Sequence, residues 1–148
     1  MPELTVVVGA AQGIGADIAR HLATQPWNGR IVLADRNLPL VEQVAAGIRA
    51  DGHDAAALEV DIADPRSIRR LVAATEEAER LALVAGIFQA VPSLEVEPDA
   101  FAQILAVNLT GTFFTAQGYA QRMVERGHGA IVAVASIASR MPRMRQAA

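Results

Sequence analysis

The sequence predicts an α/β fold, in which helices cover both faces of a doubly wound parallel sheet with strand order 3-2-1-4-5. Two observations predict this fold. Short apolar runs alternate with longer segments of helical periodicity throughout the 148 residues. The chain is also 52% hydrophobic, with a mean hydropathy of +0.26, as expected for a sheet buried on both faces. We expect residues 1–148 to form a single domain.

The first half of the chain alternates strands with helices. Residues 4–8 are a β-branched run and therefore a buried strand. Residues 13–25 are an expected helix, because Ile14, Ile18 and Leu22 recur every four positions, and the turn sequence PWNG (26–29) ends it. A second strand is expected at 30–35 and a second helix at 38–52, with Gly52 after its last turn.

The second half continues the alternation. A third strand is expected at 56–61, after which Asp64 and Pro65 begin a helix that runs to about Arg80. A fourth strand is expected at 81–86, a long helix from 98 to about 126, and a fifth strand at 130–136. Strands that alternate with helices through short connections form parallel sheets.

Composition argues against several classes of function. The net charge is -3, so no basic surplus indicates nucleic-acid binding. There is no cysteine and the three histidines lack metal-ligand spacing, so we expect no metal site. The longest apolar stretch is broken by Gln89 and Pro92, and Glu3 stands where a signal peptide would be basic. We therefore expect a cytoplasmic protein with no membrane segment.

Three glycines, Gly9, Gly13 and Gly15, lie between the first strand and the first helix. The first permits a sharp exit from the strand, the second lets backbone N–H groups approach an anion, and the third lets helix and strand pack closely. The helix N-terminus would point partial positive charge at a pyrophosphate. Such glycines also occur in plain turns, but this context of strand, loop and helix is typical of the dinucleotide-binding Rossmann fold.

Two carboxylates end neighbouring strands. Asp35 follows Gly15 by 20 residues, where a carboxylate accepts hydrogen bonds from the adenosine ribose. It favours NAD over NADP by repelling a 2′-phosphate, whereas Arg36 could pair with that phosphate. Asp61 could bind the amino group of adenine. Either aspartate could instead begin a turn.

Read together, these motifs resemble the short-chain dehydrogenase/reductase family over essentially the whole chain. The similar segments are the glycine motif VGAAQGIG (8–15), the adenine motif VDIAD (60–64), LAVNLTGTFF (105–114), and GAIVAVASIAS (129–139), which matches the segment with the family's catalytic serine. The resemblance implies an oxidoreductase that transfers a hydride between NAD and a small-molecule alcohol or ketone.

The resemblance also implies roles for particular residues. Asn108 would hold a water in a proton relay, and Ser136 would hydrogen-bond the substrate oxygen. Alternatively, Asn108 only bonds backbone locally and Ser136 is an ordinary serine at a strand end. The residues around the cofactor would be Gly9, Gln12, Gly13, Ile14, Gly15, Asp35, Arg36, Asp61, Ile62, Ala85 and Gly86.

The sequence departs from the family pattern in two places. The segment LVAG (83–86) is shorter than usual, which predicts a tighter or rearranged loop beside the cofactor. The family's base is a tyrosine followed four residues later by a lysine, and this tyrosine would fall just after Ala148. The chain has one tyrosine, Tyr119, and no lysine. We therefore expect it to be inactive alone, although the family that it resembles consists of enzymes.

Within the family, ERLALVAGI (79–87), AIVAVAS (130–136) and Pro142–Arg143 are similar to the dehydrogenases of 2,3-dihydro-2,3-dihydroxybenzoate, which use NAD in siderophore biosynthesis. A cluster of arginines at 140, 143 and 145 could attract a carboxylate substrate or could be a solvated terminus. The fifth strand would have an exposed edge, and the family pairs the long helix across a dimer interface. We therefore expect a homo-oligomer, either a dimer or a tetramer.

Three hypotheses of function follow. The first is an NAD-dependent dehydrogenase of a secondary alcohol, such as a dihydrodiol. The second is a non-catalytic dinucleotide-binding fragment of such an enzyme. The third is an adenosylmethionine-dependent methyltransferase, which also has a glycine loop and an acidic residue after the second strand. The segments around Asn108 and Ser136 argue against the third.

Overall fold

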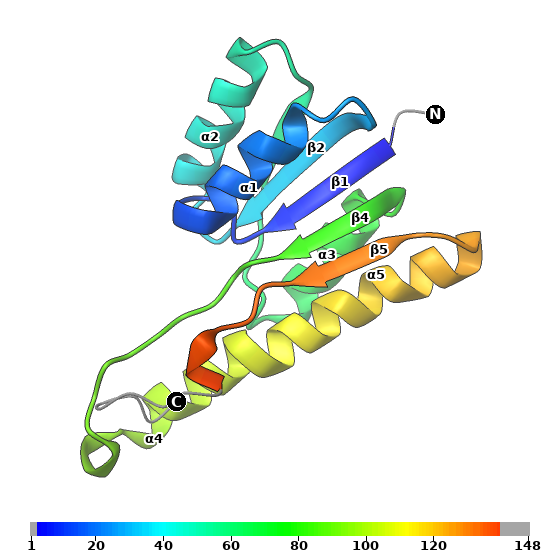
Figure 1. Ribbon diagram of the computed structural model, residues 1–148. Coiled ribbons are helices and arrows are strands. Elements are labelled where there is room, and N and C mark those ends of the chain that lie inside the picture. Colours follow the sequence, from blue (N-terminus) through cyan, green and yellow to red (C-terminus); the bar gives the residue numbers. More distant parts are fainter. Residues whose placement is uncertain (1–2, 140–148) are drawn as a thin grey trace.

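The computed structural model describes residues 3–139, which form a five-stranded sheet with helices on both faces (Figure 1). The strand order is β3-β2-β1-β4-β5, and all neighbouring strands are parallel. The predicted fold class and strand order are therefore confirmed. The strands are β1 (Glu3–Val8), β2 (Asn28–Asp35), β3 (Ala55–Glu59), β4 (Ala78–Leu83) and β5 (Ala130–Ala133).

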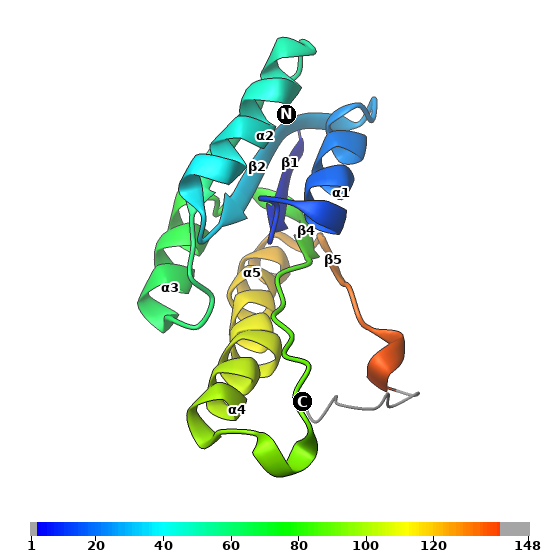
Figure 2. The same cartoon turned by 90° about the vertical axis from the view of Figure 1, so that its left-hand side faces the viewer.

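Helices lie on both faces of the sheet. In Figure 1, α1 lies in front of the sheet over β1 and β2, α2 lies in front of it over β2 and β3, and α3 and α5 lie behind it. A turned view shows α4 and the chain that follows β4 extending together beyond the sheet (Figure 2). The helices are α1 (Gly13–Ala23), α2 (Leu38–Ala50), α3 (Pro65–Ala74), α4 (Pro98–Leu105) and α5 (Thr112–Arg126), with short 3-10 turns at Ser93–Glu95 and Ile137–Ser139.

The third helix is shorter than predicted. It ends at Ala74 instead of about Arg80, and β4 begins at Ala78 instead of 81. Buried Thr75 closes the helix, because both its N–H and its hydroxyl donate to the carbonyl of Leu71, at 3.1 and 2.7 Å. The N–H of Ala78 then bonds the carbonyl of Thr75 at 3.0 Å, so the chain turns directly into β4.

The predicted long helix is present but is not uniform. A π-helical segment, Ala106–Gly111, separates α4 from α5. A Cβ atom on Gly111 would lie 2.3 Å from the carbonyl oxygen of Ile62, so the helix presses against the chain after β3 at that point. The hydroxyl of Thr112 donates to the carbonyl of Val107, five residues back, at 3.3 Å. Such π segments often occur at functional sites.

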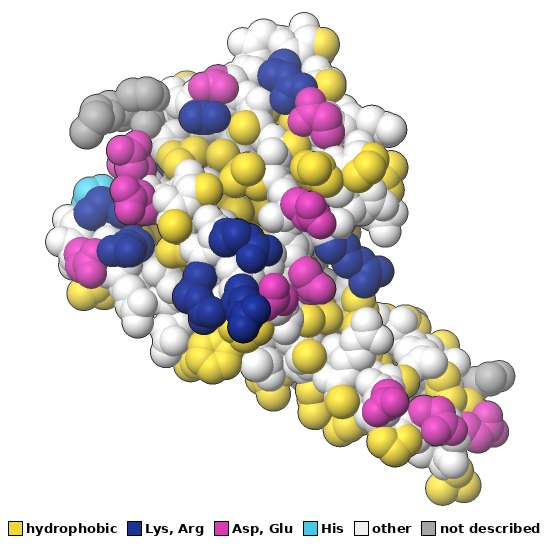
Figure 3. Space-filling model, turned by 180° about the vertical axis from the view of Figure 1, so that it is seen from behind, with side chains coloured by type: hydrophobic (Ala, Val, Ile, Leu, Met, Phe, Trp, Pro, Cys, Tyr) yellow, Lys and Arg dark blue, Asp and Glu magenta, His cyan; other side chains and the backbone are white. Residues whose placement is uncertain are grey.

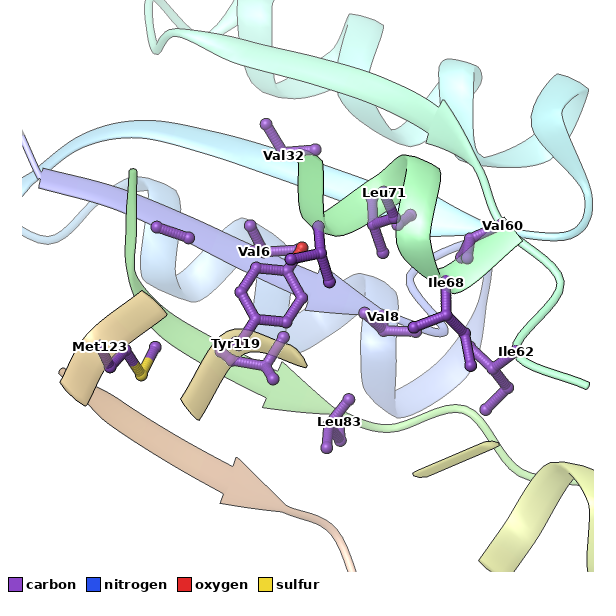
Figure 4. Close-up of a cluster of buried hydrophobic side chains, with 14 of the residues drawn as sticks. Val6, Val8, Val32, Val60, Ile62, Ile68, Leu71, Leu83, Tyr119 and Met123 are labelled. Atoms are coloured by element: carbon purple, nitrogen blue, oxygen red, sulfur yellow. The ribbon is translucent and has the colours of Figure 1, made fainter. Parts of the chain in front are cut away.

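The core is divided by the sheet into two clusters, as the period of two along a strand requires. Val6 and Val8 pack with residues of α3 and α5, including Leu71, Tyr119 and Met123 (Figure 4). Val7, which lies between those two valines, belongs to the opposite cluster with α1 and α2. β1 is therefore buried on both faces, at the centre of the sheet.

Candidate functional site

The carboxyl ends of β1 to β4 meet at one edge of the sheet, because Val8 is in register with Ala34 of β2 and with Leu83 of β4. A cleft of about 450 Å³ opens at this edge. Ligands of doubly wound folds bind outside the carboxyl ends of the strands. All eleven residues that the sequence placed around a cofactor line this cleft: Gly9, Gln12, Gly13, Ile14, Gly15, Asp35, Arg36, Asp61, Ile62, Ala85 and Gly86.

The glycine loop forms the floor of the cleft, and two of its glycines have no room for a side chain. Gly9 has a φ of 90°, and a Cβ atom there would lie 2.4 Å from the nitrogen of Ala85. A Cβ atom on Gly15 would lie 1.9 Å from the carbonyl oxygen of Gly9. The loop and the start of α1 are thus packed backbone against backbone, as predicted for the first and third glycines.

Gly13 differs from these two glycines. It adopts a φ of 53°, and apart from its chain neighbours and its own helix no atom of the described residues lies within 4 Å of its Cβ position, so this position borders open space. The side chain of Gln12, the residue before α1, makes no capping hydrogen bond to the helix. Within the part of the chain that the structure describes, no side chain caps the start of α1, and the helix dipole makes its first N–H groups a suitable site for an anion such as a pyrophosphate.

The carboxylate of Asp35 is fastened to the glycine loop. Its Oδ2 accepts a hydrogen bond from the N–H of Ala11 at 3.1 Å, and its Oδ1 accepts one from the N–H of Asn37 at 3.0 Å. The bond from Asn37 forms the turn that was the alternative role of Asp35. The bond from Ala11 joins the end of β2 to the glycine loop. Each oxygen keeps capacity for another donor. Arg36 also lines the cleft, and its guanidinium has no ion pair among residues 3–139.

Asp61 also forms a turn and lines the cleft. Its Oδ1 accepts from the N–H of Ala63 at 2.9 Å, while its own N–H donates to the hydroxyl of Ser67 on α3 at 3.0 Å. The turn interpretation is thus present in the structure. The other carboxylate oxygen makes no hydrogen bond to the rest of the described chain, and it can accept one from a ligand.

Asn108 lies in the π-helical segment and does not line the cleft. Its side-chain amide forms two hydrogen bonds of 2.8 Å with the backbone of Ile87, accepting from the N–H and donating to the carbonyl. Gly86 lies directly beside this amide. Asn108 therefore holds the wall formed by Ala85, Gly86 and Ile87. The alternative that Asn108 bonds only nearby backbone is wrong, because Ile87 lies 21 residues away in the sequence. That Asn108 holds a water stays a prediction.

Ser136 lies beyond the end of β5, exposed to solvent, and does not line the cleft either. Its hydroxyl accepts from the N–H of Ala138 at 3.1 Å. Val134, two residues earlier, does line the cleft. The chain after β5 thus passes the cleft before it reaches Ser136. Arginines 140, 143 and 145 lie outside the described residues.

The sequence analysis missed several lining residues. Most are apolar residues at strand ends, and one is polar: Gln103 of α4. An exposed glutamine on a helix carries no sequence signal of its own. Its spacing of four from Val107, and of eight from Gly111, could have shown that these three residues share one helix face.

Tyr119, the single tyrosine of the chain, is part of the core. Its hydroxyl lies 2.6 Å from the Thr75 hydroxyl, between α3 and α5, and burial raises its pKa to about 12. Within residues 3–139, no helix has the length and apolarity to cross a membrane. The same residues contain no cluster of three His, Cys, Asp or Glu side chains suited to a metal ion.

A doubly wound sheet with a glycine loop and an acidic residue after the second strand defines a Rossmann-type domain. Comparison with known proteins identifies its family. Residues 3–148 match the family model of the short chain dehydrogenases. The 2,3-dihydro-2,3-dihydroxybenzoate dehydrogenase of Bacillus subtilis is 31% identical over 150 residues, covering 99% of this chain and 57% of that protein. The D-threitol dehydrogenase of Mycolicibacterium smegmatis is 36% identical, covering 93% of this chain and 54% of that protein.

A solved structure supports the same family. A putative NAD(P)-dependent gluconate 5-dehydrogenase from Beutenbergia cavernae, with bound NADP, has a TM-score of 0.90 at 30% identity, covering 98% of this chain and 58% of that chain. The chain belongs to the short-chain dehydrogenase/reductase family of oxidoreductases, whose members bind nicotinamide dinucleotides. It spans about half the length of the curated relatives it matches.

Proposed function

We propose that the cleft binds a nicotinamide dinucleotide, and that the protein transfers a hydride between this cofactor and a secondary alcohol. The observation that supports this most is the bond between the Asp35 carboxylate and the N–H of Ala11, which joins the acidic residue to the glycine loop. The pyrophosphate would lie against the uncapped start of α1, and Asp35 would accept bonds from the adenosine ribose. Residues 1–148 would act as one dinucleotide-binding domain.

We further propose that the cofactor is NAD. The carboxylate of Asp35 would repel the 2′-phosphate of NADP, and Arg36 lines the same cleft with the opposite charge. A relative of known structure has NADP bound, so the preference of this chain needs a direct test. We expect NAD to bind about fivefold more tightly than NADP, since one close repulsion at the edge of a cleft costs about 1 kcal/mol.

Titration calorimetry with NAD and NADP tests this preference. Replacing the carboxylate in Asp35→Ser should weaken NAD and strengthen NADP, because the ribose loses an acceptor and the phosphate loses a repulsion. Arg36→Ala is the companion variant, and it should weaken NADP more than NAD, because the guanidinium could pair with the 2′-phosphate. The proposal of NAD is wrong if the unaltered chain binds NADP more tightly and Asp35→Ser leaves both affinities unchanged.

For the substrate we propose a small alcohol with neighbouring hydroxyl groups, such as a cyclic dihydrodiol of siderophore biosynthesis. The proposal is supported by the similarity to the dihydroxybenzoate enzyme, while another relative is a D-threitol dehydrogenase. Ser136 would donate to the carbinol oxygen, and Asn108 would hold the cofactor wall and a relay water. Absorbance of NADH on incubation with a dihydrodiol and with threitol separates these substrates. Faster oxidation of a secondary alcohol that has a single hydroxyl group would contradict the proposed class.

A second candidate is dinucleotide binding without appreciable turnover by the 148-residue chain itself. It is favoured by the burial of Tyr119, which keeps the only phenol of the sequence in the core. Without a general acid or base at the carbinol oxygen, hydride transfer would be slower by about 10² to 10⁴-fold. Single-turnover measurement at saturating NAD distinguishes the two candidates, since a rapid turnover would exclude the second.

We also propose that the protein is a homo-oligomer. The back of the molecule has a groove of about 640 Å³ between α3 and α5, with arginine and apolar side chains side by side on this face (Figure 3). Phe113 and Phe114 of α5 are exposed, at 58% and 45%. Apolar patches of this kind mark contacts between subunits. Light scattering should report a dimer or tetramer, and a stable monomer at high concentration would contradict the proposal.

A further inference from the structure

Gln103 is the polar residue of α4 that faces the cleft. It lies on the same helix face as Val107 and Gly111, at a spacing of four residues. Gly111 presses against the carbonyl of Ile62, and Val107 is 8% exposed. This face of the helix therefore stands against the segment that follows β3, and Gln103 forms its outer, solvent-exposed end.

The two polar side chains of this part of the cleft are chemically complementary to adenine. The side-chain amide of Gln103 makes no hydrogen bond within residues 3–139, and it can both donate and accept. Asp61 uses one carboxylate oxygen in its turn and has the other available. Adenine presents an amine beside a ring nitrogen, which is a donor next to an acceptor, and a glutamine amide pairs with such an edge through two bonds.

We propose that Gln103 is an additional cofactor-specificity residue, which binds the amino edge of the adenine ring from α4 while Asp61 binds it from the end of β3. The inference rests on the proposed function, since it assumes a dinucleotide with its adenosine half near Asp35 and Asp61. It assigns the last turn of α4 to base recognition, beside Asp61 at the end of β3.

An exposed glutamine on a helix is usually solvated, and the chain offers a matched example. Gln117 of α5 is also exposed, but it lines the groove between α3 and α5 and not the cleft. Gln103→Leu and Gln117→Leu therefore remove the same amide from two exposed helical positions. They differ in whether that amide can reach a cofactor.

The test compares NAD with its ethenoadenine analogue, in which a two-carbon bridge removes the amine hydrogens and blocks the neighbouring ring nitrogen. Affinities for both are measured by calorimetry on the unaltered chain and each variant, with circular dichroism to confirm folding. Gln103→Leu should weaken NAD by about threefold to tenfold, the value of one or two exposed hydrogen bonds, and leave the analogue nearly unchanged. Gln103→Glu, which lacks the donor, should also weaken NAD, and Gln117→Leu should change neither affinity.

The alternatives have distinct results. If NAD binds and Gln103→Leu changes its affinity no more than Gln117→Leu does, the inference is overturned and the proposed function stands. An equal loss for NAD and the analogue would also overturn it, because the amide would then not read the adenine edge. If the folded, unaltered chain binds neither dinucleotide, the proposed function fails and the inference fails with it.

Discussion

Two parts of the sheet differ in how completely helices cover them: the part from β3 to the central strand β1, here called the covered end, and the part formed by β5, here called the open end. Val6 of β1 is 0% exposed, between helices on both faces, whereas Val132 of β5 is 62% exposed. Among the described residues no helix lies in front of β4 and β5, and only α5 packs behind β5 (Figure 1). The glycine loop and Asp35 belong to the covered end, while Ser136 follows the open one.

This difference bears on function. At the covered end, the backbone around Gly9 and Gly15 is fixed on several sides, so the proposed cofactor site is held in one geometry before any ligand binds. A preorganised site loses less entropy on binding. At the open end, β5 has a neighbour on one side, and Ser136, the proposed substrate residue, stands beyond its last paired residue, Ala133. The proposed cofactor residues follow β1 to β4, whereas the proposed substrate residue follows β5.

The largest effect is expected where the covered end is most tightly packed. In Gly15→Ala the new methyl group would lie 1.9 Å from the carbonyl oxygen of Gly9, and backbone must move to make room. We expect a loss of about 3 kcal/mol in the free energy of unfolding, measured by urea denaturation. Gly47→Ala is the control: Gly47 is an exposed helical residue with open space around it, so alanine should stabilise by about 0.5 to 1 kcal/mol. If the two substitutions changed the free energy of unfolding equally, Gly15 would not be closely packed against Gly9.

A second pair of variants compares the two ends directly. Val6→Ala removes two methyl groups from the core and should cost about 2 to 3 kcal/mol, from lost burial and the remaining cavity. Val132→Ala removes the same groups from a side chain that is 62% exposed, and should cost less than about 0.5 kcal/mol. The same denaturation experiment measures both. A loss from Val132→Ala as large as that from Val6→Ala would mean that β5 is covered in solution, for example by a second copy.

A smaller effect is expected from the buried phenol. Because burial raises the pKa of Tyr119 to about 12, from an ordinary value of 10.0, the folded state holds this proton more tightly than the unfolded state. The resulting stability is present below pH 10 and is lost as pH rises towards 12. Tyr119→Phe should cost about 1 kcal/mol at neutral pH, for the lost bond to Thr75, and should remove this part of the alkaline loss.

The check is the unfolding free energy measured across the alkaline range for both chains. Ionisation of the phenol can be followed by ultraviolet absorbance without ambiguity, since Tyr119 is the only tyrosine. If Tyr119 titrated at its ordinary pKa in the folded chain, its hydroxyl would be exposed to water in solution. The core between α3 and α5 would then be less completely buried than the structure shows.

Much of the fold could be predicted from local patterns. The alternation of apolar runs with helical periodicity gave the strand order, because a parallel sheet with short connections has few alternatives. The cleft was predictable for a similar reason: strand ends of a parallel sheet meet at one edge, so the glycines and Asp35 had to lie together. These signals depend on neighbours in sequence and on rules common to the fold.

The remaining features depend on contacts between distant segments. The polar stretch after Ala74 reads as more helix, but the helix ends there in the structure, where Thr75 bonds the carbonyl of Leu71 and the hydroxyl of Tyr119. Asn108 in the π-helical segment bonds Ile87, which lies 21 residues away. The spacing of Gln103 from Val107 gives the helix face that they share, but it does not show that this face borders the cleft.

The central claim is that the covered end of the sheet is a preformed dinucleotide site. Titration calorimetry of NAD into the folded 148-residue chain, followed by competition with ADP-ribose, tests it most directly. We expect saturable binding of one NAD per chain, displaced by ADP-ribose, since the proposed contacts from Gly13, Asp35 and Asp61 lie on the adenosine diphosphate half. A folded chain that takes up neither NAD nor NADP, or NAD binding that ADP-ribose does not displace, would contradict the account.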